Sequence, residues 1–395
     1  MRGGLIKGVE SFAELFGEGD REPRADDSVL EEMFEGDGDS AAQLSALAEH
    51  TPGAGAVLKA GTVGPRVDGT TSTAKIAIVA PAAFSPKAST DASAKTITAR
   101  FKTRGHTVSL DRAPGAPFAA STVHPSGTYQ LAGTDDERWK ATKWGMFDPA
   151  TTAMICERGG YGVMRLLWQM YMFVNYDPSQ AWKTARRIVG YSDVTALLLA
   201  SYSLMRWATV HGAMLVDSGK GNETLDSLVD VLTKDPKDFY PGNLVSNTLT
   251  VSGKIPDQRV RGVLLGGNLS LVEAMYGSAF LPSLKGAILF LEETKEPEYR
   301  VDRMLEGLAL RGIMEDIRGV VLGHFTHLSD KETAELIVAS WSLPASRSGG
   351  GRRPMPCAYG LKSGHGTPNL ALWIGLEHEL VIKDKGTKGE LHLVP

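Results

Sequence analysis

Ser192 stands in the segment Val189-Gly-Tyr-Ser-Asp-Val-Thr195, between a short apolar run and a helix-like run over 196–204. This pattern is typical of a buried strand end, a sharp turn and a helix start, which can lift a hydroxyl out of the backbone beside amide N–H groups. Ser192 is therefore a candidate nucleophile. An ordinary helix cap remains the alternative, because Ser-Asp before a helix is also a common cap and Val194 replaces the second glycine of G-x-S-x-G.

A second candidate element is the glycine-rich segment Arg158-Gly-Gly-Tyr-Gly162, which follows an apolar run. Glycines at this point let the backbone approach a ligand or adopt positive φ. The spacing is not G-x-G-x-x-G, so a dinucleotide site is not indicated. Two interpretations stay open: a tight structural turn, or an amide donor for an oxyanion.

Candidate acids and bases occur in the C-terminal half of the chain. Glu292 and Glu293 end an otherwise apolar run, where a carboxylate costs desolvation energy unless it is paired. Neighbours on a strand point to opposite faces, so at most one of them faces a given site. His365 lies between two glycines, which makes a core role less expected. His324-x-x-His327 resembles a metal pair, but no third ligand is evident, and no metal or cofactor is predicted.

The elements that must position these residues alternate along the chain. Short apolar runs at 75–81, 153–156 and 187–190 predict buried strands, and helix-like runs separate them. Strands alternating with helices predict a parallel α/β sheet. Functional residues in such sheets lie beyond the carboxyl ends of the strands, the position of both Gly159 and Ser192. A further set of runs, including 286–293, predicts a second α/β domain with a β-rich end.

Composition limits the class of protein. The chain has 395 residues and a net charge of −4, which gives no general attraction to nucleic acid. Its two cysteines, Cys156 and Cys357, exclude a disulfide framework and favour a reduced, cytoplasmic setting. The chain contains no run of about 18 apolar residues, so no membrane span is predicted. The N-terminus lacks the apolar region of a signal peptide.

The first 70 residues differ from the rest, with 6 Lys or Arg and 14 Asp or Glu. Few large apolar residues occur there, which predicts an acidic extension of low order. Two similar pieces, Phe12–Asp20 and Leu30–Asp39, are either parts of a solvated tail or docking motifs for a protein partner. We expect four parts: the extension 1–70, an N-terminal α/β domain 71–215, a linker 216–258 and a C-terminal domain 259–395.

Several ordered blocks over residues 75–395 make the chain resemble the LD-carboxypeptidase family, which includes murein tetrapeptide carboxypeptidases and microcin C self-immunity peptidases. Together these blocks are far more specific than any one alone. They are Leu131–Arg138, Ile155–Gly162, Gly190–Leu197, His211–Met214, Leu265–Leu269, Ile288–Glu293, Tyr299–Leu305 and Gly364–Gly366.

The resemblance implies a serine hydrolase with Ser192 as nucleophile, Glu292 as acid and His365 as base. It also implies an oxyanion hole from the backbone N–H of Asp193 and one from Gly159 or Gly160. The site would form between the two domains. An arginine suits the terminal carboxylate of the substrate by bidentate geometry, and the neighbourhoods of Arg158 and Arg303 make them the candidates.

The expected substrate is a cytoplasmic murein tetrapeptide that loses its terminal D-Ala, and family members are commonly homodimers. Two departures from the family bear on the substrate: Glu293 replaces the more usual aspartate, and Lys362-Ser363 stand before Gly364 where the family often has Pro-Phe. The alternatives are a self-immunity amidase that cleaves a peptidyl-nucleotide antibiotic, or a catalytically idle docking protein. The intact Ser, Glu and His set argues against the idle protein.

Overall fold

A computed structural model of the protein describes most of the chain beyond its acidic N-terminal region. The segments Phe12–Asp20 and Leu30–Asp39 lie outside the described residues. The described residues are 58–114, 130–177, 179, 181–239, 247–249, 257–341 and 355–394.

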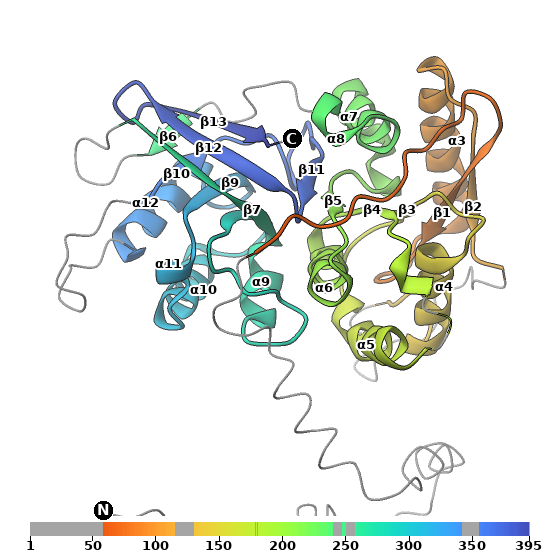
Figure 1. The fold of residues 1–395 in the computed structure, drawn as a ribbon, viewed down its shortest axis with the longest axis horizontal. Helices are drawn as coiled ribbons and strands as arrows, with labels where there is room; N and C mark the ends of the chain where they lie inside the picture. The colour runs from red at the N-terminus through yellow and green to blue at the C-terminus, as the bar shows by residue number, and fades with distance from the viewer. Residues whose placement is uncertain are drawn as a thin grey trace, which may run out of the picture. The chain divides into compact units, whose positions relative to one another are not determined.

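The first sheet has six strands in the order β11-β5-β4-β3-β1-β2 (Figure 1). The first five strands in the sequence run parallel, and β11 pairs with β5 in the antiparallel direction. The strands are β1 (Ala74–Val79), β2 (Val108–Arg112), β3 (Ala153–Cys156), β4 (Arg187–Gly190), β5 (Thr209–His211) and β11 (Leu372–Ile374).

Both faces of this sheet are covered, which explains its continuous apolar strands. In β1, Ile76 and Ile78 join one apolar core, whereas Ala77 and Val79 join another. This alternation follows from the two-residue period of a strand. The first core includes side chains of α3 (Lys87–Thr103) and α7 (Asn222–Thr233), and the second includes those of α4 (Asp135–Phe147), α5 (Leu167–Tyr176) and α6 (Thr195–Met205).

The second sheet has seven strands in the order β13-β12-β7-β8-β9-β10-β6. Its centre, from β7 to β10, is parallel, and its margins are antiparallel. The strands are β6 (Asn247–Leu249), β7 (Gln258–Asn268), β8 (Ile288–Glu293), β9 (Gly319–Phe325), β10 (Cys357–Tyr359), β12 (Glu377–Lys383) and β13 (Lys388–Leu393). The accompanying helices are α9 (Leu269–Met275), α10 (Glu298–Leu310), α11 (Ile313–Asp316) and α12 (Asp330–Trp341).

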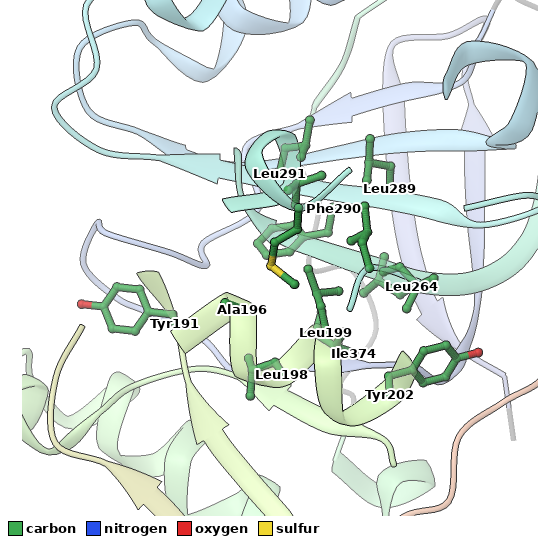
Figure 2. Packing of buried hydrophobic residues seen from close by; sticks show 14 of the residues in the cluster. Tyr191, Ala196, Leu198, Leu199, Tyr202, Leu264, Leu289, Phe290, Leu291 and Ile374 are labelled. Carbon is green, nitrogen blue, oxygen red and sulfur yellow. The ribbon is translucent and has the colours of Figure 1, made fainter. Parts of the chain in front are cut away.

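Helix α6 joins the two α/β halves. Nine of its eleven residues are buried, because it packs on the first sheet and on strand β7 and helix α9 of the second half. Figure 2 shows Leu199 of α6 beside Leu264 and Phe290 of the second sheet. One apolar core therefore runs through both halves, and the strand ends that face this core can form one site.

The predicted class, two α/β domains with mixed parallel sheets, is confirmed. Residues 58–70, which the sequence assigned to the extension, pack on the first half: Val67 is fully buried and its N–H donates to the carbonyl of Leu232. The expected linker 216–258 contains α7, whose apolar face is buried. Short α8 (Pro236–Phe239) follows it. No helix among the described residues is long and apolar enough to cross a membrane.

Candidate active site

Ser192 lies in a sharp turn between strand β4 and helix α6. Its φ is 61°, a left-handed conformation that is uncommon for a residue with a side chain. Gly190 makes the turn possible, because a Cβ there would overlap the side chain of Val194. Backbone strain of this kind clusters at functional sites, and a strained strand-to-helix turn is the geometry that exposes a nucleophilic hydroxyl. The structure thus gives Ser192 a conformation that an ordinary cap does not need.

The glycine segment after β3 lies directly against this turn. A Cβ on Gly159 would stand 2.9 Å from Ser192 Oγ and 3.4 Å from the backbone nitrogen of Asp193. Only glycine leaves this space open. Gly160 has a φ of 120°, and a Cβ there would meet the side chain of Ala83 at 2.6 Å. The backbone of Gly159 is therefore held close to the serine, and that of Gly160 close to Ala83.

Glu292 and His365 form a buried acid–imidazole pair. Glu292 Oε2 is 2.6 Å from His365 Nδ1, the glutamate is fully buried, and the His365 side chain is 16% exposed. Burial raises the pKa of Glu292, but the imidazoles of His211 and His365 outweigh it and hold that pKa at about 2. Because Nδ1 is engaged by the carboxylate, Nε2 is the ring nitrogen left for proton transfer.

The loop that carries His365 is shaped for this contact. Gly364 has a φ of 111°, and a Cβ there would lie 2.8 Å from Glu292 Oε2. The N–H of Gly364 donates to Asn369 Oδ1 at 2.9 Å, and the Asn369 N–H donates to Thr224 Oγ1 of α7 at 3.1 Å. The segment between the halves therefore supports the histidine loop.

The nucleophile turn and the acid–imidazole pair meet where the halves join. The ring of Tyr191, the neighbour of Ser192, packs edge-on against the His365 imidazole with centroids 4.9 Å apart. Thr195, at the start of α6, accepts a hydrogen bond from the N–H of Asn268 at 3.1 Å. A Cβ on Gly267 would collide with Thr195. The region where the two halves join is called the seam below. It is lined by Ser192, Gly159, Glu292 and His365.

The side chain of Asp193 links the serine turn to the rest of the site. The buried carboxylate accepts a hydrogen bond from the N–H of Val163 at 2.9 Å, which ties the serine turn to the glycine segment. Burial raises its pKa, against the opposing effects of that N–H and of Arg138. Arg138 is 1% exposed and donates to the carbonyls of Pro81 and Gly162. It also pairs with Asp135 at 2.5 Å.

The two arginines named from the sequence lie in different places. Arg158 directly precedes Gly159, is half-buried, and donates to the carbonyl of Phe84 at 3.2 Å. Arg303 lines a cavity of about 420 Å³ between α9 and α10, and Ser192, Glu292 and His365 are not among its lining residues. Arg158 is thus part of the segment that lies against Ser192, whereas Arg303 lies in the cavity between α9 and α10.

Sequence reasoning assigned no role to His211, although it belongs to one of the ordered blocks. It ends strand β5, is fully buried, and lies beside Glu292. A histidine at the carboxyl end of a parallel strand was the available signal. The pair His324 and His327 finds no third partner: the described residues hold no cluster of three His, Cys, Asp or Glu suited to a metal. The His324 ring packs against Gly366 instead.

Two family models match the chain. The LD-carboxypeptidase N-terminal domain matches residues 76–212, and the LD-carboxypeptidase C-terminal domain matches residues 261–380. The first match ends at the strand that follows α6, and the second includes the strands that carry Glu292 and the loop of His365.

Curated relatives carry related names. A murein tetrapeptide carboxypeptidase of Pseudomonas aeruginosa is 29% identical over 63% of this chain and 78% of its own length. The microcin C7 self-immunity protein of Escherichia coli is 26% identical over 49% of this chain and 62% of its own length. A carboxypeptidase-named relative of Rickettsia conorii is 31% identical, and the chain spans 60% of it.

Solved structures have the same fold. A muramoyltetrapeptide carboxypeptidase from Oxalobacter formigenes superposes with a TM-score of 0.59 at 27% identity, covering 81% of this chain and 99% of that one. A protein from Bacillus anthracis that resembles the self-immunity protein reaches a TM-score of 0.64 at 19% identity, covering 84% of this chain and all of that one. The second likeness bears on the fold alone.

Proposed function

The chain belongs to the LD-carboxypeptidase family, and we propose from this membership that it is a serine-type carboxypeptidase that releases the terminal D-Ala from a murein tetrapeptide. The observation that carries the proposal is the 2.6 Å contact between Glu292 and His365, which lies at the seam that also holds the strained Ser192 turn. A buried carboxylate on Nδ1 orients an imidazole and stabilises its cation.

The proposed chemistry follows from these positions. His365 Nε2 takes the hydroxyl proton of Ser192 as Oγ bonds to the scissile carbonyl carbon. The N–H of Asp193 and an N–H of Gly159 or Gly160 stabilise the oxyanion. His365 then gives its proton to the leaving D-Ala nitrogen as the C–N bond breaks. Water, deprotonated by His365, attacks the acyl carbon, and the ester bond to Ser192 breaks as the proton returns to Oγ.

Recognition of the substrate's terminal carboxylate is proposed for Arg158. A guanidinium binds a carboxylate in two parallel hydrogen bonds, and Arg158 adjoins Gly159, which touches Ser192. Arg303 is the less suitable of the two candidates because its cavity excludes the proposed catalytic residues.

A self-immunity peptidase is the second candidate function. It is favoured by the E. coli relative and by the departures at Lys362 and Ser363, next to the histidine loop. In that case the same chemistry would cleave a bond in a peptidyl-nucleotide antibiotic. The two candidates share the machinery and differ only in the group that must fit beside it.

One assay separates the candidates. Full-length protein and the variant Ser192→Ala are incubated with a murein tetrapeptide and with a processed microcin, and products are identified by mass spectrometry. The matched control is Ser109→Ala, which removes a hydroxyl from the edge strand β2; that hydroxyl donates to Asp111 at 3.3 Å. D-Ala release by wild type and by the control, but not by Ser192→Ala, supports the carboxypeptidase. Absence of turnover with both substrates contradicts both candidates.

We propose a cytoplasmic homodimer, as the family resemblance implies, with residues 1–57 of the acidic extension available to a protein partner. Light scattering on the full chain and on a chain lacking residues 1–57 tests both ideas. A monomeric full chain contradicts the dimer. The docking role is contradicted if the deletion changes neither the assembly state, nor the location of the protein in cells, nor the activity in the assay above.

A further inference from the structure

A second imidazole lies against the proposed catalytic carboxylate. His211 Nε2 is 3.6 Å from Glu292 Oε1, whereas His365 contacts the other oxygen, Oε2, and the side chains of His211 and Glu292 are fully buried. The His211 ring is held edge-on by Phe290, with centroids 4.9 Å apart, and by Tyr191 at 5.8 Å. Aromatic packing of this kind fixes a ring plane. The orientation of His211 relative to Glu292 is therefore set by the core.

Among the described residues, the two facing atoms are available only to each other. Neither Glu292 Oε1 nor His211 Nε2 makes a hydrogen bond with any other residue that the structure describes. A buried polar atom left unpaired costs free energy, and the cost is larger when the atom is charged. The 3.6 Å separation is slightly longer than a hydrogen bond, and a small adjustment closes it. Each atom is thus the available partner of the other.

His211 is also linked to the loop of His365. Its Nδ1 is 3.3 Å from the hydroxyl of Ser363, which stands two residues before His365. Ser363 is fully buried. Three successive contacts therefore connect Ser363 to His211, His211 to Glu292, and Glu292 to His365. Such outer partners fix the orientation and tautomer of the groups they touch.

We propose that His211 is a positioning residue: its neutral ring accepts the Ser363 hydroxyl at Nδ1, donates Nε2–H to Glu292 Oε1, and so holds Oε2 on His365 Nδ1. The neutral form is the consistent one, because one buried carboxylate can balance one cation and the mechanism needs that cation on His365. The inference rests on the proposed hydrolase function. It adds a residue that touches neither the substrate nor the reacting atoms.

Two substitutions test the role. His211→Phe keeps a ring in the aromatic cage but removes the donor, and His211→Gln keeps an amide donor at the approximate position of Nε2. With the murein tetrapeptide, we expect His211→Phe to lower kcat about 10²-fold with KM unchanged, and His211→Gln to recover part of the loss. The matched control, His378→Phe, removes another fully buried imidazole, from β12, and keeps wild-type kcat.

A second measurement does not depend on the substrate. The proton between His365 Nδ1 and Glu292 should give a low-field ¹H NMR resonance in the full-length protein, absent in Glu292→Gln. We expect His211→Phe to shift or broaden it and His378→Phe to leave it unchanged, with near-UV circular dichroism confirming the fold. If His211→Phe does not fold, Ser363→Ala replaces it, with the same direction of change and a smaller size.

The outcomes separate this inference from the proposed function. If wild type releases no D-Ala while the resonance responds to His211→Phe, the substrate proposal fails and the positioning role stands. If His211→Phe folds and retains both the wild-type resonance and wild-type kcat, the positioning role is overturned whatever the substrate.

Discussion

The end of strand β8 has two faces, and each carries a buried glutamate. Glu292 faces the seam with His365 and His211, and Glu293 faces α9, where it accepts hydrogen bonds from Ser270 and Asn268. Burial raises the pKa of both. On the seam face the imidazoles reverse the effect, whereas on the α9 face neutral donors do not, and the pKa of Glu293 stays raised.

This difference shows that burial alone does not define a catalytic carboxylate. The hydrogen bonds from the His211 and His365 imidazoles keep Glu292 ionised, so it can stabilise a positive imidazole on His365. Neutral donors give Glu293 a structural role, in which it fastens the end of β8 to the start of α9. The two neighbouring residues therefore offer an internal control for each other.

The largest effect is expected from comparing Glu292→Gln with Glu293→Gln. In a serine triad the change from acid to amide costs about 10⁴-fold in kcat, because the imidazole loses its orientation and the stabilisation of its cation. We expect a loss of that order for Glu292→Gln and less than about tenfold for Glu293→Gln, since only the first face touches His365. Steady-state kinetics with a murein tetrapeptide measures both. Equal losses would remove the distinction between the faces.

The pH dependence of stability should have opposite signs on the two faces. Glu292 has a pKa near 4.5 unfolded and about 2 folded, so it contributes about 3 kcal/mol above pH 4.5, lost as the pH falls toward 2. The raised pKa of Glu293 acts in reverse: its cost grows as the pH rises above 4.5. Urea unfolding between pH 3 and 7 checks this. Glu292→Gln should flatten the acid side of the curve, and Glu293→Gln should gain stability relative to wild type as the pH rises.

A third substitution should disturb the seam face without changing a charge. In Gly364→Ala the added Cβ would lie 2.8 Å from Glu292 Oε2 and push the carboxylate away from His365. We expect kcat to fall about 10²-fold, the usual effect of a displacement near 1 Å. Gly312→Ala is the matched control: its φ of 83° imposes the same kind of backbone strain, but no atom lies within 4 Å of the new Cβ. Kinetics and thermal unfolding of both variants separate strain from displacement, and equal kcat values would contradict the argument.

Much of this arrangement was readable from the sequence. Apolar runs that stop at Pro81, Gly190 or Glu293 indicated the parallel strands, and the two-residue period of a strand predicted that Glu292 and Glu293 face apart. The leucines and valines of α7 recur at helical spacing, a signal that the prediction of a linker over 216–258 missed.

Other parts of the arrangement depend on contacts between residues far apart in the sequence. Strand β11 has three residues and joins the first sheet from the far end of the chain, and nothing local in Leu372–Ile374 indicates that partner. His211 lies 81 positions from Glu292, and their contact depends on how the two sheets meet. Contacts across a seam are set by packing of α6, which a pattern along one strand does not encode.

The smallest effect is expected on the α9 face. Ser270 donates to Glu293 Oε2 through its hydroxyl at 2.6 Å and its N–H at 2.9 Å. Ser270→Ala removes only the hydroxyl bond, so the free energy of unfolding should fall by about 1–2 kcal/mol, the value of a hydrogen bond to a charged or buried acceptor. Because this bond lies on the opposite side of β8 from His365, kcat should stay within about twofold of wild type, far below the scale of a lost catalytic contact. Urea unfolding tests the expected loss of stability, and tetrapeptide kinetics on the same preparation test the expected kcat. A large fall in kcat with unchanged stability would mean that Glu293 also acts in the reaction, and the two faces of β8 would then share one function.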